Sequence, residues 1–313
     1  MKVLLTGAAG QLGRALIASR PPGVDLVATS RNGGDGLVAL DLADAAACRE
    51  AVLQHRPDWV LNAGACTAVD RAESEPELAM AVNAGAPAAF ASALAELSLA
   101  DGKTGRLLQV STDFVFNGAQ GSPYKPGQAL DPLGVYGASK AAGETAALQL
   151  PGARVLRTGW VYGPVGKNFC LTMLRLHRLK AAAGDALGVI ADQVGCPTST
   201  LTFAAAGWRA LGVGLEPAAA AALPQVLHWS DAGAASWYDF ALAIGELGVT
   251  AGLLDHAAQV QPLTTAEYPT PAQRPSYSLL DCTASRAALG LEALHWRQAL
   301  QEVLTQVADQ VVA

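Results

Sequence analysis

Residues 2–19 read KVLLTGAAGQLGRALIAS, a short apolar run that leads through three glycines into a helical pattern. Residues 2–6 are rich enough in branched side chains for a buried parallel strand. Gly7 permits a tight turn, Gly10 lets a phosphate approach the backbone, and Gly13 lets a helix pack closely on the sheet. The helix N-terminus then faces the phosphates. The stretch predicts a dinucleotide-binding turn, and the alternative is a seam of small residues in a helix.

The chain up to residue 164 keeps alternating short apolar runs with helical patterns, which is typical of a doubly wound parallel sheet. Further strands are expected at residues 25–30, 57–65, 105–112 and 153–164. Segment 73–97 is expected to hold two helices broken near Asn83. We therefore predict an α/β, Rossmann-like dinucleotide-binding domain over residues 1–164. Residues 165–313 are expected to form a smaller, mainly substrate-binding region, with some segments returning to the sheet.

Composition limits the function classes. The chain has 313 residues, of which 51% are hydrophobic and 15% charged, as in a compact enzyme. Its net charge of -6 argues against a nucleic-acid partner. The five cysteines show no metal-ligand spacing and are expected to be reduced, packed thiols. The first apolar run ends at Gly7 and no apolar stretch of about 18 residues follows, so we expect a cytoplasmic protein without a membrane partner.

Residues 135–140, VYGASK, place Tyr136 and Lys140 one helical turn apart, so that both side chains point the same way. A phenol with its usual pKa of about 10 is a poor acid at neutral pH, and a neighbouring ammonium stabilises its phenolate. Thr112, at a strand end, could hold a substrate oxygen while Tyr136 transfers its proton. We predict Thr112, Tyr136 and Lys140 as the catalytic set, against the alternative of a surface pair and a strand-closing threonine.

Ser30 and Arg31 occupy the position, about 20 residues beyond the glycines, that selects the cofactor. An acidic residue there binds the ribose hydroxyls of NADH, whereas an arginine accommodates the 2′-phosphate of NADPH. The sequence therefore predicts NADPH. Two alternatives stay open: Arg31 packs flat on the adenine, or Asp35 folds back toward the ribose and allows NADH.

Several blocks together resemble a known superfamily. TGAAGQLG, NAGA, STDFVF and YGASK resemble the extended short-chain dehydrogenases/reductases, in which Ser/Thr, Tyr and Lys form the catalytic set. Longer blocks at residues 67–83, 111–118, 159–176, 191–199 and 268–281 resemble the dTDP-4-dehydrorhamnose reductase family. This resemblance covers nearly the whole chain. It implies reduction of the 4-keto group of dTDP-4-dehydro-L-rhamnose by a nicotinamide cofactor, giving dTDP-L-rhamnose for surface polysaccharide.

The resemblance also implies positions for the cofactor. Those at the phosphates are Gly10, Gln11 and Leu12. Those in the adenine region are Asp41 and Leu42. Those along the nicotinamide side are Ala65, Cys66, Thr67 and Val110, with Tyr136 and Lys140 at the nicotinamide end. The family's usual aromatic or histidine is Cys66 here, and its common tyrosine is Phe114, but neither change removes a proton-transfer group.

For the substrate, the resemblance implies Trp160 against the sugar and Thr112 and Asp113 at its 4-oxygen. Trp160 could instead be simple core. Arg274 is expected at the diphosphate, because a planar guanidinium suits phosphate oxygens. Some family members hold Mg²⁺ at a dimer contact through glutamates, which are replaced here by Ala15, Leu201 and Arg297. We expect no metal, and a homodimer without that contact stays open.

Two other functions compete. The first is a sugar-nucleotide dehydratase, epimerase or other reductase on the same scaffold. Dehydratases of this superfamily follow the Thr-Asp pair with a glutamate, whereas Phe114 follows Asp113 here. The second is a non-catalytic regulatory subunit of the methionine adenosyltransferase type, and the complete catalytic set weighs against it.

Overall fold

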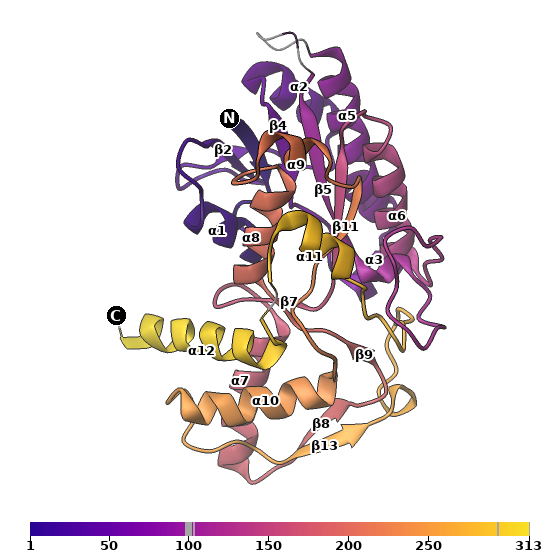
Figure 1. The fold of residues 1–313 in the computed structure, drawn as a ribbon. Coiled ribbons are helices and arrows are strands. Elements are labelled where there is room, and N and C mark those ends of the chain that lie inside the picture. The colour runs from indigo at the N-terminus through magenta and orange to yellow at the C-terminus, as the bar shows by residue number, and fades with distance from the viewer. Residues whose placement is uncertain (98–101, 103, 293, 313) are drawn as a thin grey trace.

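The structure is a computed structural model that describes residues 1–97, 102, 104–292 and 294–312 (Figure 1). Its centre is a seven-stranded sheet built from β1 (Lys2–Thr6), β2 (Asp25–Ser30), β3 (Val38–Ala39), β4 (Trp59–Asn62), β5 (Arg106–Thr112), β6 (Arg154–Thr158) and β11 (Val226–His228). The strand order is β11-β6-β5-β4-β1-β2-β3, and every pairing is parallel. The predicted doubly wound α/β fold is confirmed.

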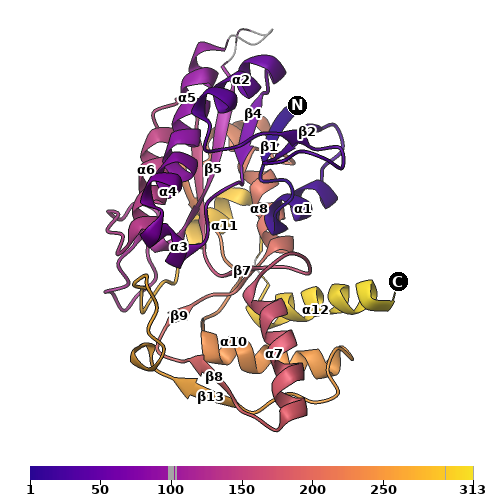
Figure 2. The ribbon, with the colours of Figure 1, turned by 180° about the vertical axis from the view of Figure 1, so that it is seen from behind.

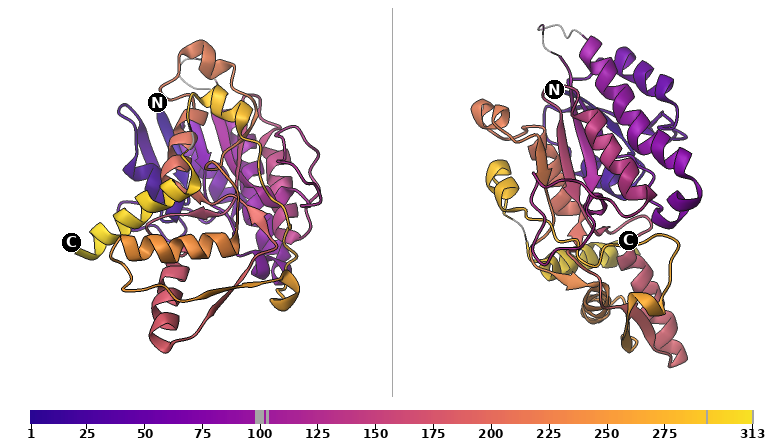
Figure 3. Two further views of the ribbon diagram at one scale, coloured as in Figure 1. Left: turned by 60° about the horizontal axis from the view of Figure 1, so that its bottom comes forward. Right: turned by 90° about the vertical axis from the view of Figure 1, so that its right-hand side faces the viewer.

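Helices cover both faces of this sheet, as the right-hand view of Figure 3 shows. Those on one face are α2 (Ala45–His55), α5 (Ala86–Glu96) and α6 (Val135–Ala147). Those on the other face are α1 (Gln11–Ala18), α8 (Thr200–Ala210) and α11 (Thr283–Leu289). Along β1, Leu4 packs toward α2 and α5, whereas Val3 and Leu5 pack toward α1 and α8. Both faces are buried, which is why the strands read as continuous apolar runs.

The second half of the chain forms a smaller layer beneath the sheet (Figure 2). Its helices are α7 (Phe169–Ala183), α10 (Trp237–Thr250) and α12 (Trp296–Val312), and their shared core is buried. Short strand pairs complete it: β7 (Val161–Tyr162) with β10 (Thr198–Ser199), β8 (Leu187–Ile190) with β13 (Val260–Leu263), and β9 (Val194–Gly195) with β12 (Ala235–Ser236). The short helices α9 (Pro217–Ala221), η2 (Asp113–Val115) and η3 (Thr265–Glu267) lie between these elements in sequence. β11 returns to the central sheet, and the domain boundary at residue 164 stays a prediction.

The helix expected to break near Asn83 does not break there. α3 (Val69–Ser74) ends before Pro76, and the chain then runs as α4 (Pro76–Met80), one π turn η1 (Ala81–Gly85) and α5. Proline at the start of α4 explains the true break. The π turn presents the Asn83 side chain, which holds both backbone groups of Cys66 and the Ser139 hydroxyl. The predicted break was wrong because a π turn absorbs one extra residue without ending the helix.

The continuous helix Pro76–Glu96 is long and apolar enough to cross a membrane by length and composition, with a mean hydropathy of 1.5. The expectation that the sequence holds no such stretch was therefore wrong. Half of this helix is buried, and α5 packs against α2 and α6, as a core helix does. The five cysteines are free and four of them are buried, as expected.

Candidate functional site

The glycine turn between β1 and α1 has the conformation that its residues predict. Gly7 has a φ of 66°, and a Cβ placed on it would lie 2.6 Å from the Gly64 Cα. A Cβ on Gly13 would lie 2.5 Å from the Ala8 Cα. Gly10 caps α1 without a side-chain hydrogen bond, so the first N–H groups of that helix are left for a ligand. The cradle is formed by backbone that no larger residue can replace.

A cavity of about 900 Å³ opens at the carboxyl ends of β1, β4, β5 and β6. It brings together most of the predicted site residues: Gly7, Gly10, Gln11, Leu12, Gly13, Arg31, Leu42, Ala65, Thr67, Val110, Thr112, Asp113, Tyr136, Lys140, Trp160 and Arg274. In an open parallel sheet, this edge is where ligands bind. The cavity is large enough for a dinucleotide's reactive end and a small substrate together.

Three predicted cofactor residues stand outside the lining of this cavity. The Ser30 hydroxyl donates to the Gly33 carbonyl at 3.4 Å. The Asp41 carboxylate lies 3.7 Å from the Arg31 Nε, and both side chains are largely exposed. Cys66 is half-buried, and its backbone is held by Asn83. Asp41 therefore contacts Arg31, which lines the cavity, but does not line the cavity itself. Direct contacts of Ser30, Asp41 and Cys66 with a cofactor stay predictions.

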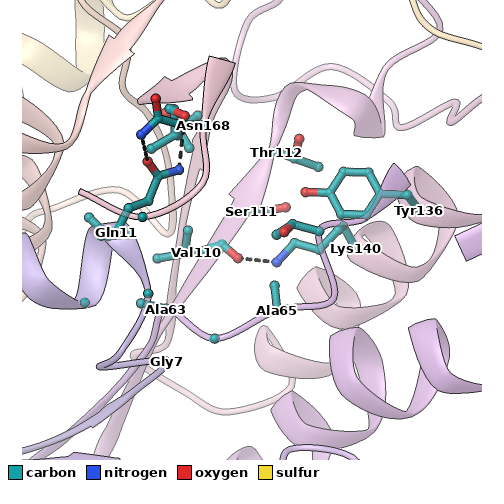
Figure 4. Close-up of a pocket in the computed structure, with 18 of the residues that line it drawn as sticks. Gly7, Gln11, Ala63, Ala65, Val110, Ser111, Thr112, Tyr136, Lys140 and Asn168 are labelled. Carbon is teal, nitrogen blue, oxygen red and sulfur yellow. Dashed lines mark hydrogen bonds between the residues drawn. The ribbon is translucent and has the colours of Figure 1, made fainter. Parts of the chain in front are cut away.

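Tyr136 and Lys140 both lie on α6 and face the cavity, but not as a bonded pair (Figure 4). The Lys140 Nζ donates to the Val110 carbonyl at 2.6 Å. Burial lowers the pKa of Lys140 to about 8, and the Glu144 carboxylate one turn further on offsets part of this shift. The Lys140 ammonium thus points toward the backbone of β5 and not toward the Tyr136 hydroxyl.

The Tyr136 hydroxyl points toward Thr112 (Figure 4). Burial raises the pKa of Tyr136 well above its usual value, and the Thr112 hydroxyl offsets part of the shift. The expectation that Lys140 lowers this pKa was wrong for this structure, because the ammonium is engaged by the Val110 carbonyl. A phenol that keeps its proton at neutral pH is suited to donate it.

Asp113 follows Thr112 directly and is fully enclosed. Its Oδ1 accepts a hydrogen bond from the Thr112 hydroxyl at 3.0 Å, whereas its Oδ2 has no partner among the described residues. Burial raises the pKa of Asp113 to about 6; the Ser278 hydroxyl, which is near the carboxylate but outside hydrogen-bond geometry, and the bonded Thr112 hydroxyl offset part of this shift. The hydroxyls of Ser111 and Thr158 are also buried, and neither has a partner in the part of the chain that the structure describes. Unpaired polar atoms beside a cavity indicate a polar ligand there.

Trp160 sits at the cavity edge in a strained conformation. Its φ is 51°, in the left-handed region that large residues avoid, and such strain concentrates at functional sites. Its ring stacks on Trp237 with 3.5 Å between centroids and 4° between planes. A Cβ on Gly195 would lie 2.5 Å from the Trp160 ring. Sequence reading missed Trp237, because its segment showed only the capping box of Ser236 and Asp239.

A second cavity of about 450 Å³ adjoins the first and shares Phe114, Trp160, Trp237 and Arg274 with it. The rest of its wall is mainly apolar, from Phe169, Met173, Leu176, Leu187, Val189, Ile190 and Leu263. Trp160 and Trp237 therefore line both the larger cavity at the sheet edge and the mainly apolar cavity in the lower layer.

Arg274 lines both cavities but already has a counter-charge. Its guanidinium donates to the two Asp70 oxygens at 3.1 and 2.8 Å, and also to the Thr270 hydroxyl and the Ala272 carbonyl. The hydrogen bond from Arg274 holds the pKa of Asp70 below its usual value. Arg274 thus lines the cavities in an ion pair with Asp70, and its contact with a diphosphate stays a prediction.

Two comparisons concern the sequence. The chain matches the family described as RmlD substrate binding domain over residues 1–309. It is 41% identical over 304 residues to the dTDP-4-dehydrorhamnose reductase of Streptomyces griseus, covering 96% of this chain and 91% of that one. It is 38% identical over 309 residues to a probable dTDP-4,6-dihydroxy-2-methyloxan-3-one 4-ketoreductase of Streptomyces antibioticus, covering 98% and 96%.

The fold also resembles a solved structure, the dTDP-4-dehydrorhamnose reductase of Bacillus anthracis in complex with NADP. The TM-score is 0.82 at 29% identity, over 97% of this chain and 99% of that one. These matches cover nearly the full length of the chain. The glycine cradle and the phenol beside Thr112 agree with them. The chain belongs to the RmlD substrate binding domain family, the family of the dTDP-4-dehydrorhamnose reductases.

Proposed function

We propose that this protein reduces the 4-keto group of dTDP-4-dehydro-L-rhamnose with NADPH, giving dTDP-L-rhamnose for surface polysaccharide synthesis. One observation carries the proposal: the buried Tyr136 phenol faces Thr112 in the cavity that also holds the glycine cradle. Proton donor and dinucleotide site thus face the same space. The Streptomyces griseus relative, which bears this activity in its name, supports the substrate.

The reduction adds a hydride to the carbonyl carbon and a proton to its oxygen. The nicotinamide, when bound in the cavity, supplies the hydride. The Thr112 hydroxyl turns its single proton from Asp113 Oδ1 to the sugar 4-oxygen, and Tyr136 delivers its own proton to that oxygen as negative charge develops there. Stabilisation of the remaining phenolate by Lys140 requires its ammonium to turn from the Val110 carbonyl toward the phenol. General acid catalysis of this kind is worth roughly 100 to 10,000-fold.

The sugar is held by groups around that oxygen. The unpaired Asp113 Oδ2 accepts a sugar hydroxyl, and the Trp160 ring packs on the apolar face of the sugar. Arg274 faces the substrate diphosphate with its charge partly offset by Asp70. NADPH is the cofactor: the Bacillus anthracis relative was solved with NADP, and Arg31 lines the cavity where the 2′-phosphate is expected.

A second candidate substrate is another dTDP-4-keto sugar, because the Streptomyces antibioticus relative is named as a 4-ketoreductase of a different dTDP sugar. Dehydration is disfavoured, because Phe114 packs edge-on against Tyr136 at 5.6 Å where a dehydratase would have its glutamate. A purely regulatory role is disfavoured by the assembled Thr112, Tyr136 and Lys140. We further propose a cytoplasmic location, a homodimer without a metal contact, and no membrane or nucleic-acid partner.

The test is an assay of the purified protein with NADPH and dTDP-4-dehydro-L-rhamnose. We expect nicotinamide oxidation and a product with rhamnose stereochemistry at C4. Tyr136→Phe serves as the inactive control. Turnover with another dTDP-4-keto sugar but none with this one would reject the named substrate and keep the reductase. Tight association with methionine adenosyltransferase and no turnover of any keto sugar would reject the enzyme altogether.

A further inference from the structure

The side chain of Gln11 is committed to protein contacts rather than to a ligand. Its Nε2 donates to the Val161 carbonyl at 3.1 Å, and its Oε1 accepts from the Asn168 Nδ2 at 3.3 Å (Figure 4). Only the backbone N–H of Gln11, in the first turn of α1, remains for a phosphate. The side chain instead joins the glycine cradle to a segment 157 positions away.

Asn168 fixes the shape of that segment, residues 163–168, from its other end. Its Nδ2 also donates to the carbonyls of Gly163 at 2.9 Å and Val165 at 3.3 Å, and its Oδ1 caps α7 by accepting from the Leu171 N–H. Gly166 has a φ of 82°, and a Cβ there would lie 3.6 Å from the Gln11 Cβ. The segment is therefore pinned beside the cradle.

Lys167 is the cation of this segment, and it lines the same cavity as Gly7 and Gly10. Its side chain is exposed and has no hydrogen-bond or ion-pair partner within the described part of the chain. The other cations of the cavity are engaged: Lys140 with the Val110 carbonyl, Arg274 with Asp70, and Arg31 close to Asp41. Among the described cations that line the cavity, Lys167 is the one whose charge has no protein partner.

A pyrophosphate at the cradle needs such a charge. The N-terminus of α1 provides the equivalent of about half a positive charge, whereas a pyrophosphate linkage carries two negative charges. A lysine ammonium adds a full, mobile charge on a flexible stem.

We propose that Lys167, positioned by the Gln11–Asn168 bridge, binds the pyrophosphate of the nicotinamide dinucleotide. The inference rests on the proposed function only for the identity of this ligand. It gives the lower layer a direct share in cofactor binding, because the segment leads into α7. The substrate carries a diphosphate as well, and we assign Lys167 to the cofactor because the bridge ties it to the glycine turn.

The experiment measures dissociation constants by fluorescence titration without substrate, for NADPH and NADH in turn, and by calorimetry for dTDP. Lys167→Ala is compared with Lys167→Arg and with the matched control Lys180→Ala, a lysine of α7 that pairs with Asp185 outside both cavities. We expect Lys167→Ala to weaken NADPH and NADH alike by about tenfold, equivalent to about 1.4 kcal/mol. Lys167→Arg should retain most of the affinity, and dTDP binding and Lys180→Ala should be unchanged.

A double-mutant cycle tests the bridge. In the Gln11→Ala background, which frees the segment, Lys167→Ala should cost markedly less than in the wild type. Equal costs in both backgrounds would contradict the role of the bridge.

Unchanged affinity for both dinucleotides, loss for dTDP alone, or loss for NADPH alone would each overturn the assignment of Lys167 to the pyrophosphate. These measurements need no turnover. They therefore stand apart from a failure of the proposed sugar substrate, which would leave cofactor binding intact.

Discussion

The glycine turn and the tryptophan pair are two walls of one cavity, and they are built in opposite ways. At the turn the backbone itself forms the surface, with Gly7 in the left-handed region and no room for a Cβ on Gly13. At the other wall the surface consists of two side chains, Trp160 and Trp237, from distant parts of the chain. Damage to the first wall should cost stability and cofactor binding, whereas damage to the second should cost substrate positioning alone.

Tyr136 lines the same cavity as both walls, and its removal should have the largest effect. Tyr136→Phe keeps the ring and deletes the proton donor, so kcat should fall by roughly 100 to 10,000-fold. The NADPH dissociation constant should stay close to that of the wild type, whereas Lys140→Ala should damage both quantities. Steady-state kinetics and fluorescence titration check this. Near-normal turnover of Tyr136→Phe would remove the phenol from the mechanism.

The backbone wall is tested by Gly13→Ala. Its Cβ would press on the Gly7 carbonyl and on the Ala8 Cα, so the free energy of unfolding should fall by about 3 kcal/mol. The matched control is Gly207→Ala in α8, whose Cβ would find ordinary contact with Leu16 at 3.4 Å. That variant should gain about 0.5 to 1 kcal/mol, because alanine favours helix. Urea denaturation gives both values, and equal losses would mean that the turn is no tighter than a helix seam.

The side-chain wall is tested by Trp237→Ala, which removes the support of Trp160. We expect kcat/KM for the sugar nucleotide to fall by about tenfold, chiefly through KM, because an aromatic pair contributes roughly 0.5 to 1.5 kcal/mol beyond its buried area. NADPH binding should be unchanged, and the near-ultraviolet circular dichroism of the stacked indoles should disappear. Tyr238→Phe, next in the chain and outside both cavities, is the control. A loss of NADPH affinity in Trp237→Ala would erase the contrast between the walls.

Arg31→Ala should have the smallest effect and sharpens the cofactor side of the comparison. The Arg31 side chain is 67% exposed and shares its charge with Asp41, so water screens its contact with a 2′-phosphate. We expect kcat/KM with NADPH to fall by a factor that corresponds to about 1 kcal/mol of lost transition-state stabilisation, which is small for a hydrogen bond to a charged group. The kcat/KM with NADH should change little. Equal losses with both cofactors would show that Arg31 packs on the adenine instead.

The sequence predicted what local geometry determines. The glycine turn, the strands that precede each rim residue, and the one-turn spacing of Tyr136 and Lys140 all follow from neighbours in the chain. The pKa shifts of Tyr136 and Lys140 could not be predicted in this way, because the Val110 carbonyl that engages Lys140 lies 30 positions away. Arg274 lines the cavities, but its partner Asp70 is 204 positions distant.

The side-chain wall formed by Trp160 and Trp237 was the least predictable part. Trp160 was singled out by a resemblance, whereas Trp237 was hidden within an ordinary helix start. Their stack depends on how the lower layer packs, and no local pattern encodes it. The π turn at Ala81–Gly85 was missed for a similar reason, since its purpose lies in the contacts of Asn83 with Cys66 and Ser139.

The last strand of the sheet matters for a chain emerging from the ribosome. Val226–His228 pair with Val155–Arg157, so the edge of β6 stays open until the ribosome has added roughly 70 more residues, which takes about 4 to 14 seconds. During that time Val155 and Leu156, fully buried in the finished protein, border an unpaired strand. Open edges of this kind recruit other chains. The nascent first half therefore keeps this edge open until β11 arrives, and a fragment cut at residue 164 would lack the strand that covers it.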